Sequence, residues 1–381
     1  MNDWSMVQSL FQYSYEAWII LVLTAVTCSL IGTFLVLRQL SMIADAISHT
    51  VLLGIVLGYF VAGHLDSPLL ILGAAFFGLI TVWATETLTE TNLVESGDAI
   101  GIVFSFFFAL AIILVTRFAS NVHLDIDIVL TGEVILAPLN RMTVFGWSLP
   151  KAFVEMFILL IVNFAFIVVF FKELKLTTFD KAYGYLAGFN VTLLFYMIMS
   201  LVSVTTVVAF DAVGAILVIA FLIGPGATAY LICKDLKMAL FVAAGYATFN
   251  ATVGYFIGIL FNVSIAGAAA VVTGTTFFLT FLFHREGLLT SIISRRRQAK
   301  QLKLDLVLLH IANHTEQNEE LSELKVNTLD SHFNWSEAVT AQLVKKLFHQ
   351  SLIKIDPQYD VYQLTSKGAQ QLETIYQRYN L

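Results

Sequence analysis

The sequence predicts an all-α polytopic membrane bundle of about nine transmembrane helices, followed by a small water-soluble α+β domain. Of the 381 residues, 58% are hydrophobic and only 13% are charged, with a mean hydropathy of +0.82. An ordinary soluble domain carries about a quarter charged residues. The charges are also uneven, with 30 in residues 1–299 and 18 in residues 300–381. This composition excludes a soluble enzyme, a fibrous protein and a disordered chain.

The N-terminal part holds nine apolar runs that are long enough to cross a bilayer. About 20 consecutive apolar residues span the hydrocarbon core as a helix, and the runs lack the alternation of a transmembrane barrel. The chain begins without the basic region of a cleaved signal peptide, so we expect the first run to remain as a span. The predicted spans are 16–37, 43–62, 68–86, 98–116, 149–171, 191–210, 212–233, 236–260 and 264–283.

The distribution of Lys and Arg predicts the orientation in the cell membrane. With nine spans and the basic trio Arg295, Arg296 and Arg297 after the last, the C-terminus is expected in the cytoplasm and the N-terminus outside. Inner loops then hold ten basic residues and outer loops three, as the positive-inside rule requires. Segment 117–148 is too polar and proline-interrupted to span, so it is an outer loop or a re-entrant segment.

Small residues predict where the helices approach one another closely. Gly54-x-x-x-Gly58 and Gly254-x-x-x-Gly258 lack the side chains that would hold neighbouring helices apart. The string Gly224-Pro225-Gly226 lies inside the seventh span, where we expect it to break or kink the helix.

The charge density also predicts the domain boundaries. We expect a transmembrane domain over 1–290, a basic linker over 291–303 and a cytoplasmic domain over 304–381. In this last domain a helix begins near Leu304, and a second begins near Trp335 with Asn334 as its N-cap. Strands follow at 353–355 and 361–364, and a last helix starts near Thr365. Helices followed by a small hairpin suggest a winged helix-turn-helix.

Asp45 and His49 are the first candidates for a functional site. Four residues apart, they share one face of a helix and lie about 6 Å apart along its axis. A carboxylate and an imidazole that converge can hold a divalent cation, and an ionisable residue within a span is a functional candidate. The alternative is that Asp45 caps the helix and His49 is a hydrogen-bonded structural residue.

A second candidate lies in segment 117–148. If the chain is extended there, His123, Asp125 and Asp127 point to one side and could form an acidic mouth or a relay for cations. A solvated loop edge is the simpler interpretation. Asp98 and Asp211, at the ends of spans, could line a pathway or simply cap a helix, and the structural role is the favoured interpretation.

Residues 179–190, between two spans on the inner side, form a third candidate. This segment is short, amphipathic and rich in small residues, which suits docking in a groove of another protein; an ordinary inner loop fits equally well.

The sequence contains no Gly-rich phosphate-binding loop that ends in Gly-Lys-Ser or Gly-Lys-Thr. The chain is therefore not expected to be an enzyme, and ATP hydrolysis would occur in a partner subunit. Within residues 179–190, the residues expected to contact this partner subunit are Phe179, Asp180, Tyr183, Gly184, Leu186 and Gly188.

Several short motifs follow one another along the chain. They are Leu37-Arg38 followed by Asp45-Ala-Ile-Ser-His49, Asp98-Ala-Ile-Gly-Ile-Val-Phe104, His123-Leu-Asp-Ile-Asp127, Ala212-Val-Gly-Ala-Ile-Leu-Val and Gly224-Pro-Gly-Ala-Thr-Ala229. Their order and spacing, over most of residues 16–285, resemble the permease subunit of the manganese/zinc/iron branch of ABC-type importers. The last motif departs from the Thr-Pro-Ala-like string of many relatives, which leaves the local kink geometry open.

The resemblance implies partners, a substrate and residue roles. Such a permease pairs with a second copy or a paralogue in membrane lipid, with cytoplasmic ATP-binding subunits and an extracytoplasmic metal-binding protein. It implies that Asp45 and His49 coordinate the ion transiently in the translocation path, and that 179–190 insert into the ATPase as a coupling helix. No cofactor is expected to be bound permanently. The metal is the transported ion: manganese, zinc or iron.

Two stretches of the tail, 344–353 and 362–368, resemble the winged-helix portion of metal-responsive, diphtheria-toxin-regulator-like repressors. DNA binding usually needs a basic surface, and this tail has a net charge of −2. We therefore expect regulation, dimerisation or contact with the ATPase rather than DNA as a partner. The histidines of the tail are interpreted as surface residues: His310, His314, His332 and His349.

Two other functions stay open at this point. A gradient-driven metal transporter or channel would need no ATPase, so copurification with a nucleotide-binding subunit distinguishes it. A membrane-tethered metal-responsive regulator would retain DNA through residues 300–381, and the acidic balance of that tail argues against it.

Overall fold

The computed structural model describes residues 3–64, 67–118, 134–144, 146–284, 287–316, 324, 333, 335–357 and 359–379. The chain forms two compact units, residues 1–287 and residues 288–381. Each unit is described by itself.

Within its described residues, the first unit has nine helices long and apolar enough to cross a membrane. This confirms the predicted number, and each helix overlaps its predicted span. The length of the apolar runs was a sufficient signal, because a span must cover the full hydrocarbon thickness. The helices are α1 (Asp3–Leu37), α2 (Ser41–Ala62), α3 (Pro68–Glu90), α4 (Ser96–Phe118), α6 (Lys151–Val169), α9 (Val191–Val213), α10 (Ala215–Ile232), α11 (Leu236–Phe261) and α12 (Ile265–Phe283).

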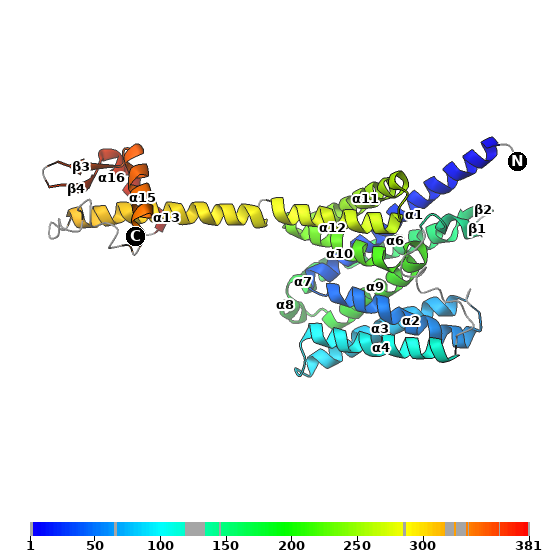
Figure 1. The fold of residues 1–381 in the computed structure, drawn as a ribbon. Helices are drawn as coiled ribbons and strands as arrows, with labels where there is room; N and C mark the ends of the chain where they lie inside the picture. The colour runs from blue at the N-terminus through cyan, green and yellow to red at the C-terminus, as the bar shows by residue number, and fades with distance from the viewer. Residues whose placement is uncertain are drawn as a thin grey trace. The chain divides into compact units, whose positions relative to one another are not determined.

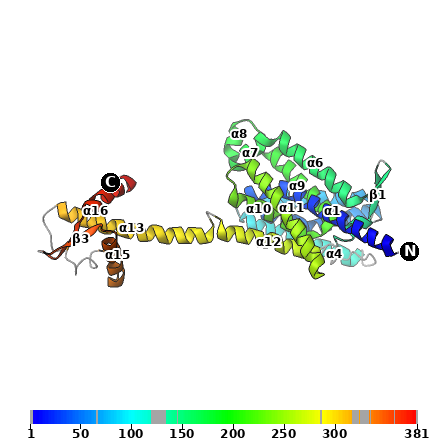
Figure 2. The same ribbon diagram turned by 90° about the horizontal axis from the view of Figure 1, so that it is seen from above.

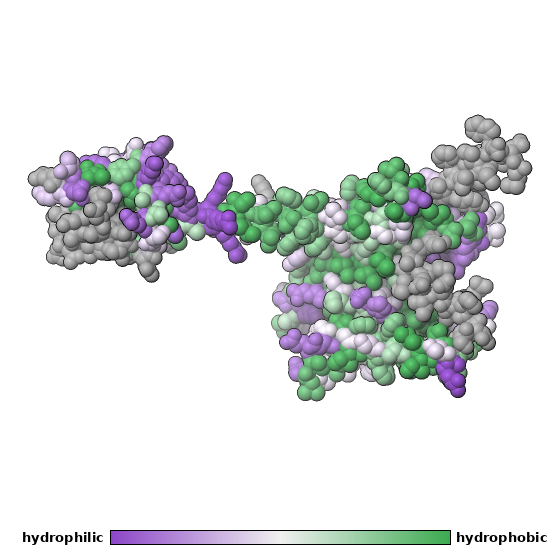
Figure 3. All heavy atoms as spheres, viewed as in Figure 1, coloured by the Kyte–Doolittle hydropathy of each residue, from purple (hydrophilic) through white to green (hydrophobic). Residues whose placement is uncertain are grey.

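Apolar side chains predominate on the face of the first unit that Figure 3 shows. Phe106 on α4, Phe241 on α11 and Val271 on α12 are among the exposed ones. Such a surface is unfavourable in water but is solvated by lipid chains. The backbone meets the same requirement, because a helix satisfies its own hydrogen bonds in the absence of water.

The membrane helices form two groups (Figure 1). Helices α2, α3 and α4 pack against one another, and α1 packs against α6, α9, α10 and α11. Helix α9 contacts both α1 and α3, so it joins the two groups. The core between them contains fully buried Phe34 of α1, Ile198 of α9 and Phe221 of α10.

Glycines set the spacing of helices at the two predicted places. A Cβ atom on Gly54 would lie 2.3 Å from the carbonyl oxygen of Gly73 in α3. A Cβ atom on Gly254 would lie 2.3 Å from the Cα atom of Ala269 in α12. Both distances are shorter than any real contact of a Cβ atom. Only glycine allows these backbones to approach so closely, as expected from the motifs.

Helix α10 is not broken at Gly224-Pro225-Gly226, where the sequence predicts a break or a kink. Helix α10 continues from Ala215 to Ile232 with Pro225 inside it. Proline removes one backbone hydrogen bond, but the neighbouring helices pack tightly on both sides of this turn. A Cβ atom on Gly226 would meet the backbone of Thr33 in α1, and one on Gly224 would meet the side chain of Thr273 in α12. This packing holds the helix together where the sequence alone predicts a break.

Short elements lie at opposite ends of the first unit (Figures 1 and 2). At one end, α7 (Phe171–Phe179) and α8 (Lys181–Leu186) connect α6 to α9. At the other, strands β1 (Arg141–Val144) and β2 (Trp147–Pro150) form an antiparallel hairpin after the 3₁₀ turn η1 (Ala137–Leu139). The 3₁₀ turn and most of the hairpin lie in segment 117–148, in which no transmembrane helix was predicted, and β2 extends to Pro150, so that α6 begins two residues later than its predicted span. Residues 119–133 lie outside the described part.

The second unit combines helices with one small hairpin. Its buried apolar side chains, including Leu308, Leu347 and Ile375, form a separate core. Buried Asp305 accepts hydrogen bonds from Arg378 at 3.0 Å and from the hydroxyl of Tyr379 at 3.1 Å. The elements are α13 (Leu288–Glu316), α15 (Glu337–His349), β3 (Ile353–Asp356), β4 (Val361–Leu364) and α16 (Ser366–Tyr379).

The two strands and the last helix of this unit lie where they were predicted, but two boundaries differ. The basic segment 291–303, expected to be a linker, is part of helix α13. Its Arg, Gln and Lys residues favour helix, so the local propensity continues through it. Helix α15 begins at Glu337 with Ser336 at the N-cap, two residues later than predicted, and Asn334 lies outside the described residues. These elements establish a helical unit with a hairpin.

Candidate functional site

Asp45 and His49 lie one turn apart on the same face of α2, as their spacing predicted. The Nε2 atom of His49 is 3.7 Å from the Oδ1 atom of Asp45. The side chain of Asp45 is 44% exposed and that of His49 is 34% exposed, whereas Ala46 and Ile47 between them are buried. The hydrophobic side of α2 therefore anchors the helix, and the polar pair projects from the opposite side.

Helix α4 borders this pair. The ring of His49 lies 5.4 Å from the ring of Phe104 and 5.4 Å from the ring of Phe108, measured between centroids. The two phenylalanines pack against the imidazole and restrict its position beside Asp45. These aromatic contacts hold the imidazole of His49 next to the carboxylate of Asp45 while leaving it partly exposed.

Asp45 and His49 provide two metal donors from one chain. No group of three or more His, Cys, Asp or Glu side chains that could hold a metal occurs in the described part of the chain. Zinc in proteins usually takes about four ligands. An ion at Asp45 and His49 would therefore need further ligands from water or from another chain.

The pair lies toward the end of the bundle that carries α7 and α8. Asp45 is four residues into α2, which places it about 6 Å from the start of that helix. The turn before α2 is connected to this end, because the side chain of Arg38 donates hydrogen bonds to Thr177 and Thr178 at the end of α7.

In the sequence, Arg38 stands out only as part of a motif and as one of the basic residues that predict the membrane orientation. The structure shows that it is 8% exposed, and burial lowers the pKa of its guanidinium to about 10. The group therefore remains charged at pH 7. A charged residue directly after an apolar span was the available signal, but its partners are about 140 residues away in the chain.

Residues 179–190 form a projecting turn of helix at the α7–α8 end. The side chain of Asp180 accepts a hydrogen bond from the backbone N–H of Tyr183 at 2.8 Å and caps α8. Gly188 adopts a φ of +83°, which ends the helix and returns the chain toward α9. Gly184 is buried, and a Cβ atom there would lie 3.0 Å from Thr177.

The exposed side of this segment is apolar. Phe179, Tyr183 and Leu186 are 60%, 56% and 87% exposed, respectively. Large apolar side chains on a polar end of a membrane protein are unfavourable in water, so this surface is suited to a protein partner.

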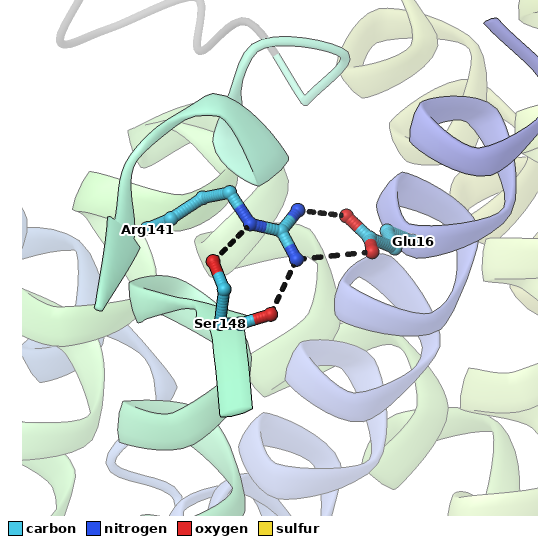
Figure 4. A network of polar contacts seen from close by, with 3 residues as sticks. All are labelled: Glu16, Arg141 and Ser148. Atoms are coloured by element: carbon cyan, nitrogen blue, oxygen red, sulfur yellow. Dashed lines mark hydrogen bonds and ion pairs between the residues drawn. The ribbon is translucent and has the colours of Figure 1, made fainter. Parts of the chain in front are cut away.

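The hairpin at the other end is attached to α1 through Arg141 (Figure 4). Its guanidinium forms a bidentate contact with Glu16, with the shorter N–O distance at 2.7 Å. It also donates to the hydroxyl and the carbonyl oxygen of Ser148 on β2, at 2.9 and 2.6 Å. Bidentate arginine–carboxylate pairs fix geometry well, so this network holds the hairpin on the end of α1.

Three other sequence candidates, His123, Asp125 and Asp127, lie outside the described residues. Asp98 lies in the first turn of α4, and Asp211 is an exposed residue near the end of α9. In the second unit, the rings of His310 and His314 lie 4.5 Å apart between centroids and are tilted by 59°, and both residues are half-buried.

Comparison with known proteins identifies the family. Residues 10–285 match the sequence model described as the ABC 3 transport family. The chain belongs to this family. The zinc transport system membrane protein TroD of Treponema pallidum (strain Nichols) is 41% identical over 342 residues, which cover 89% of this chain and 93% of the relative. That match necessarily reaches into the second unit.

Two further similarities support the same ABC 3 family membership. The manganese transport system membrane protein MntD of Bacillus subtilis (strain 168) is 46% identical over 273 residues, covering 71% of this chain and 92% of the relative. The solved structure of PsaBC from Streptococcus pneumoniae in complex with Fab has a TM-score of 0.59 and 29% identity, covering 73% of this chain and 96% of that chain. The membrane bundle is therefore the fold of this family.

Proposed function

We propose that this ABC 3 family chain is the transmembrane subunit of an ATP-driven importer of divalent manganese, zinc or iron. The observation that carries the proposal is the pairing of Asp45 with His49 on one face of a membrane-spanning helix. Relatives named as manganese and zinc transport system membrane proteins support this substrate class.

The donor atoms explain the choice of metals. A carboxylate oxygen and an imidazole nitrogen suit manganese, iron and zinc, and they disfavour copper(I), which prefers thiolate. A transported ion must also leave its ligands, so binding in the path has to be weak. Two half-exposed donors from one chain meet this requirement. A second permease copy or a paralogue would supply a second pair of donors.

The ends of the bundle have different partners in this proposal. The exposed apolar side chains of residues 179–190 are the surface for a cytoplasmic ATP-binding subunit. The nearby basic residues Lys172, Lys175 and Lys181 favour a cytoplasmic position for this end. The β1–β2 end then faces an extracytoplasmic metal-binding protein, with the N-terminus outside and the C-terminus in the cytoplasm. His123, Asp125 and Asp127 belong to this outer region and are proposed as its acidic mouth.

The tail, residues 304–381, has a regulatory role in this proposal. The order of helix, hairpin and helix favours a winged-helix-like domain, and the net charge of −2 over residues 300–381 argues against DNA as its partner. Retention of DNA by the full-length protein, lost when the tail is deleted, would contradict this role.

Uptake of ⁵⁴Mn²⁺ and ⁶⁵Zn²⁺ tests the proposed function. We expect vesicles that contain this chain with its ATP-binding subunit to accumulate at least one of these ions only when ATP is present. Accumulation without ATP would instead indicate a gradient-driven transporter or channel. The ATP-binding subunit should copurify with this chain from detergent-solubilised membranes.

A further inference from the structure

Arg38 fixes the turn that leads into α2. Its Nη2 atom donates to the hydroxyl of Thr177 at 3.0 Å and its Nε atom donates to the hydroxyl of Thr178 at 3.2 Å. The turn itself is tight, because Gln39 adopts a φ of +60° and the N–H of Leu40 bonds to the carbonyl of Leu35 at 2.8 Å. The side chain of Arg38 is therefore linked through a tight turn to the start of α2, four residues before Asp45.

Thr177 connects the same side chain to the exposed segment at residues 179–190. Thr177 is fully buried, and its hydroxyl donates to the carbonyl of Glu173 one turn earlier in α7 at 2.8 Å. Its Cγ2 atom would be 3.0 Å from a Cβ atom on Gly184 in α8. A chain of direct contacts thus runs from α8 through Thr177 and Arg38 to the start of α2.

Two buried polar atoms near the Arg38–Thr177 hydrogen bond make no hydrogen bond among the described residues. The Nη1 atom of Arg38 and the Oε2 atom of Glu173 are both buried without a hydrogen-bond partner among the described residues. Leaving a buried charged group incompletely bonded is unfavourable, and a fully bonded arrangement would be more stable. The two groups have opposite charge, and both adjoin Thr177, which accepts a hydrogen bond from Arg38 and donates one to the carbonyl of Glu173.

We propose that Arg38 is a positioning residue that couples residues 179–190, the proposed docking segment for the ATP-binding subunit, to the Asp45–His49 pair. It does so by exchanging its hydrogen bonds as α7 moves. This inference rests on the function proposed above. In the conformation described here, Arg38 is bonded to Thr177 and Thr178. In the alternative conformation it forms an ion pair with Glu173, and the start of α2 moves with it.

Helix α7 has a second connection that provides a control. Lys175 forms an ion pair with Asp235 in the turn between α10 and α11, with an N–O distance of 2.8 Å. These side chains are 48% and 52% exposed, and exposed ion pairs contribute little. Replacement of Lys175 therefore removes a basic side chain from the same helix without removing a buried connection.

The test compares metal uptake with ATP hydrolysis in vesicles that contain the whole transporter. In Arg38→Gln and in the isosteric Thr177→Val, we expect ATP hydrolysis within about twofold of the wild type and the number of ions taken up per ATP lowered about tenfold or more. Arg38→Lys keeps the charge but not the two directed bonds, so its ratio should be intermediate. The ratio for Lys175→Ala should equal that of the wild type.

The ratio separates coupling from a structural role. If uptake and ATP hydrolysis fall in proportion in Arg38→Gln and Thr177→Val, or if both variants keep the wild-type ratio, the proposal is wrong. If Arg38→Gln does not reach the membrane, Thr177→Val decides, because it changes the acceptor without burying a new group. Wild-type vesicles that take up none of Mn²⁺, Zn²⁺ and Fe²⁺ would overturn the proposed function, and this inference with it.

Discussion

The Nε2 atom of His49 lies 3.7 Å from the Oδ1 atom of Asp45, across one turn of α2. This distance is longer than a good hydrogen bond, so neither group is fully engaged by the other. Both donors are partly exposed on the same side of a helix whose other side is buried. In a chain of the ABC 3 transport family, this relationship makes the pair the first target for mutation.

Asp45→Asn and His49→Ala should each lower the rate of metal uptake at limiting metal concentration by about 10- to 100-fold, a range known for disturbed metal sites. Asparagine keeps the shape of the side chain but removes its negative charge, and alanine removes the nitrogen donor. Uptake of ⁵⁴Mn²⁺ or ⁶⁵Zn²⁺ is the measurement, normalised to the amount of protein in the membrane.

His64→Ala is the matched control for the histidine. His64 is an exposed residue just after the end of α2, so its loss should leave uptake unchanged. Normal uptake by both variants of the pair would remove their role as ligands.

Tyr183→Ala should weaken binding of the ATP-binding subunit. Tyr183 is a large apolar side chain that is 56% exposed on α8. Aromatic residues that dominate protein interfaces contribute about 2 kcal/mol or more when truncated, so the fraction of subunit that copurifies should fall strongly. Tyr15→Ala is the control, because Tyr15 has a similar exposure of 61% but lies on α1 at the end of the bundle that carries the β1–β2 hairpin. Equal recovery of the subunit with both variants would contradict the docking role.

The sequence predicts those features that the bilayer or a local spacing imposes. A span needs a long apolar run, so the nine helices could be found from composition alone. The i, i+4 spacing of Asp45 and His49 places them on one face of any helix, so their proximity could also be predicted.

Features that depend on distant neighbours could not be predicted. Pro225 predicts a break locally, but packing of α10 against Thr33 and Thr273 keeps the helix continuous. The hydrogen bonds from Arg38 to Thr177 and Thr178 join segments about 140 residues apart, and no periodicity connects them. Helix α13 continues through residues 291–303 because these residues favour helix. The prediction of a linker rested on their charge and did not consider this propensity.

Gly254→Ala should destabilise the membrane unit, because the new methyl group would lie 2.3 Å from the Cα atom of Ala269. Overpacking of this kind costs about 1–3 kcal/mol. Gly245→Ala on the same helix is the control, since a Cβ atom there has nothing within 4 Å. That change should be neutral or stabilising by up to about 1 kcal/mol, because alanine favours helix. Thermal unfolding in detergent measures both, and an equal Tm for the two variants would argue against the close approach of α11 and α12.

The proposed orientation predicts where Cys233 can be modified. Cys28 is fully buried in α1, whereas Cys233 is half-buried in the turn between α10 and α11. A membrane-impermeant maleimide should therefore label Cys233 in inside-out vesicles and leave it unlabelled in intact cells. Burial raises the pKa of the Cys233 thiol, so less of it is thiolate at pH 7 than in an ordinary exposed cysteine. Since the thiolate is the reactive form, labelling should be slow at pH 7 and faster as the pH rises. Cys233→Ser should abolish the signal, and labelling of intact cells at the rate of inside-out vesicles would reverse the orientation.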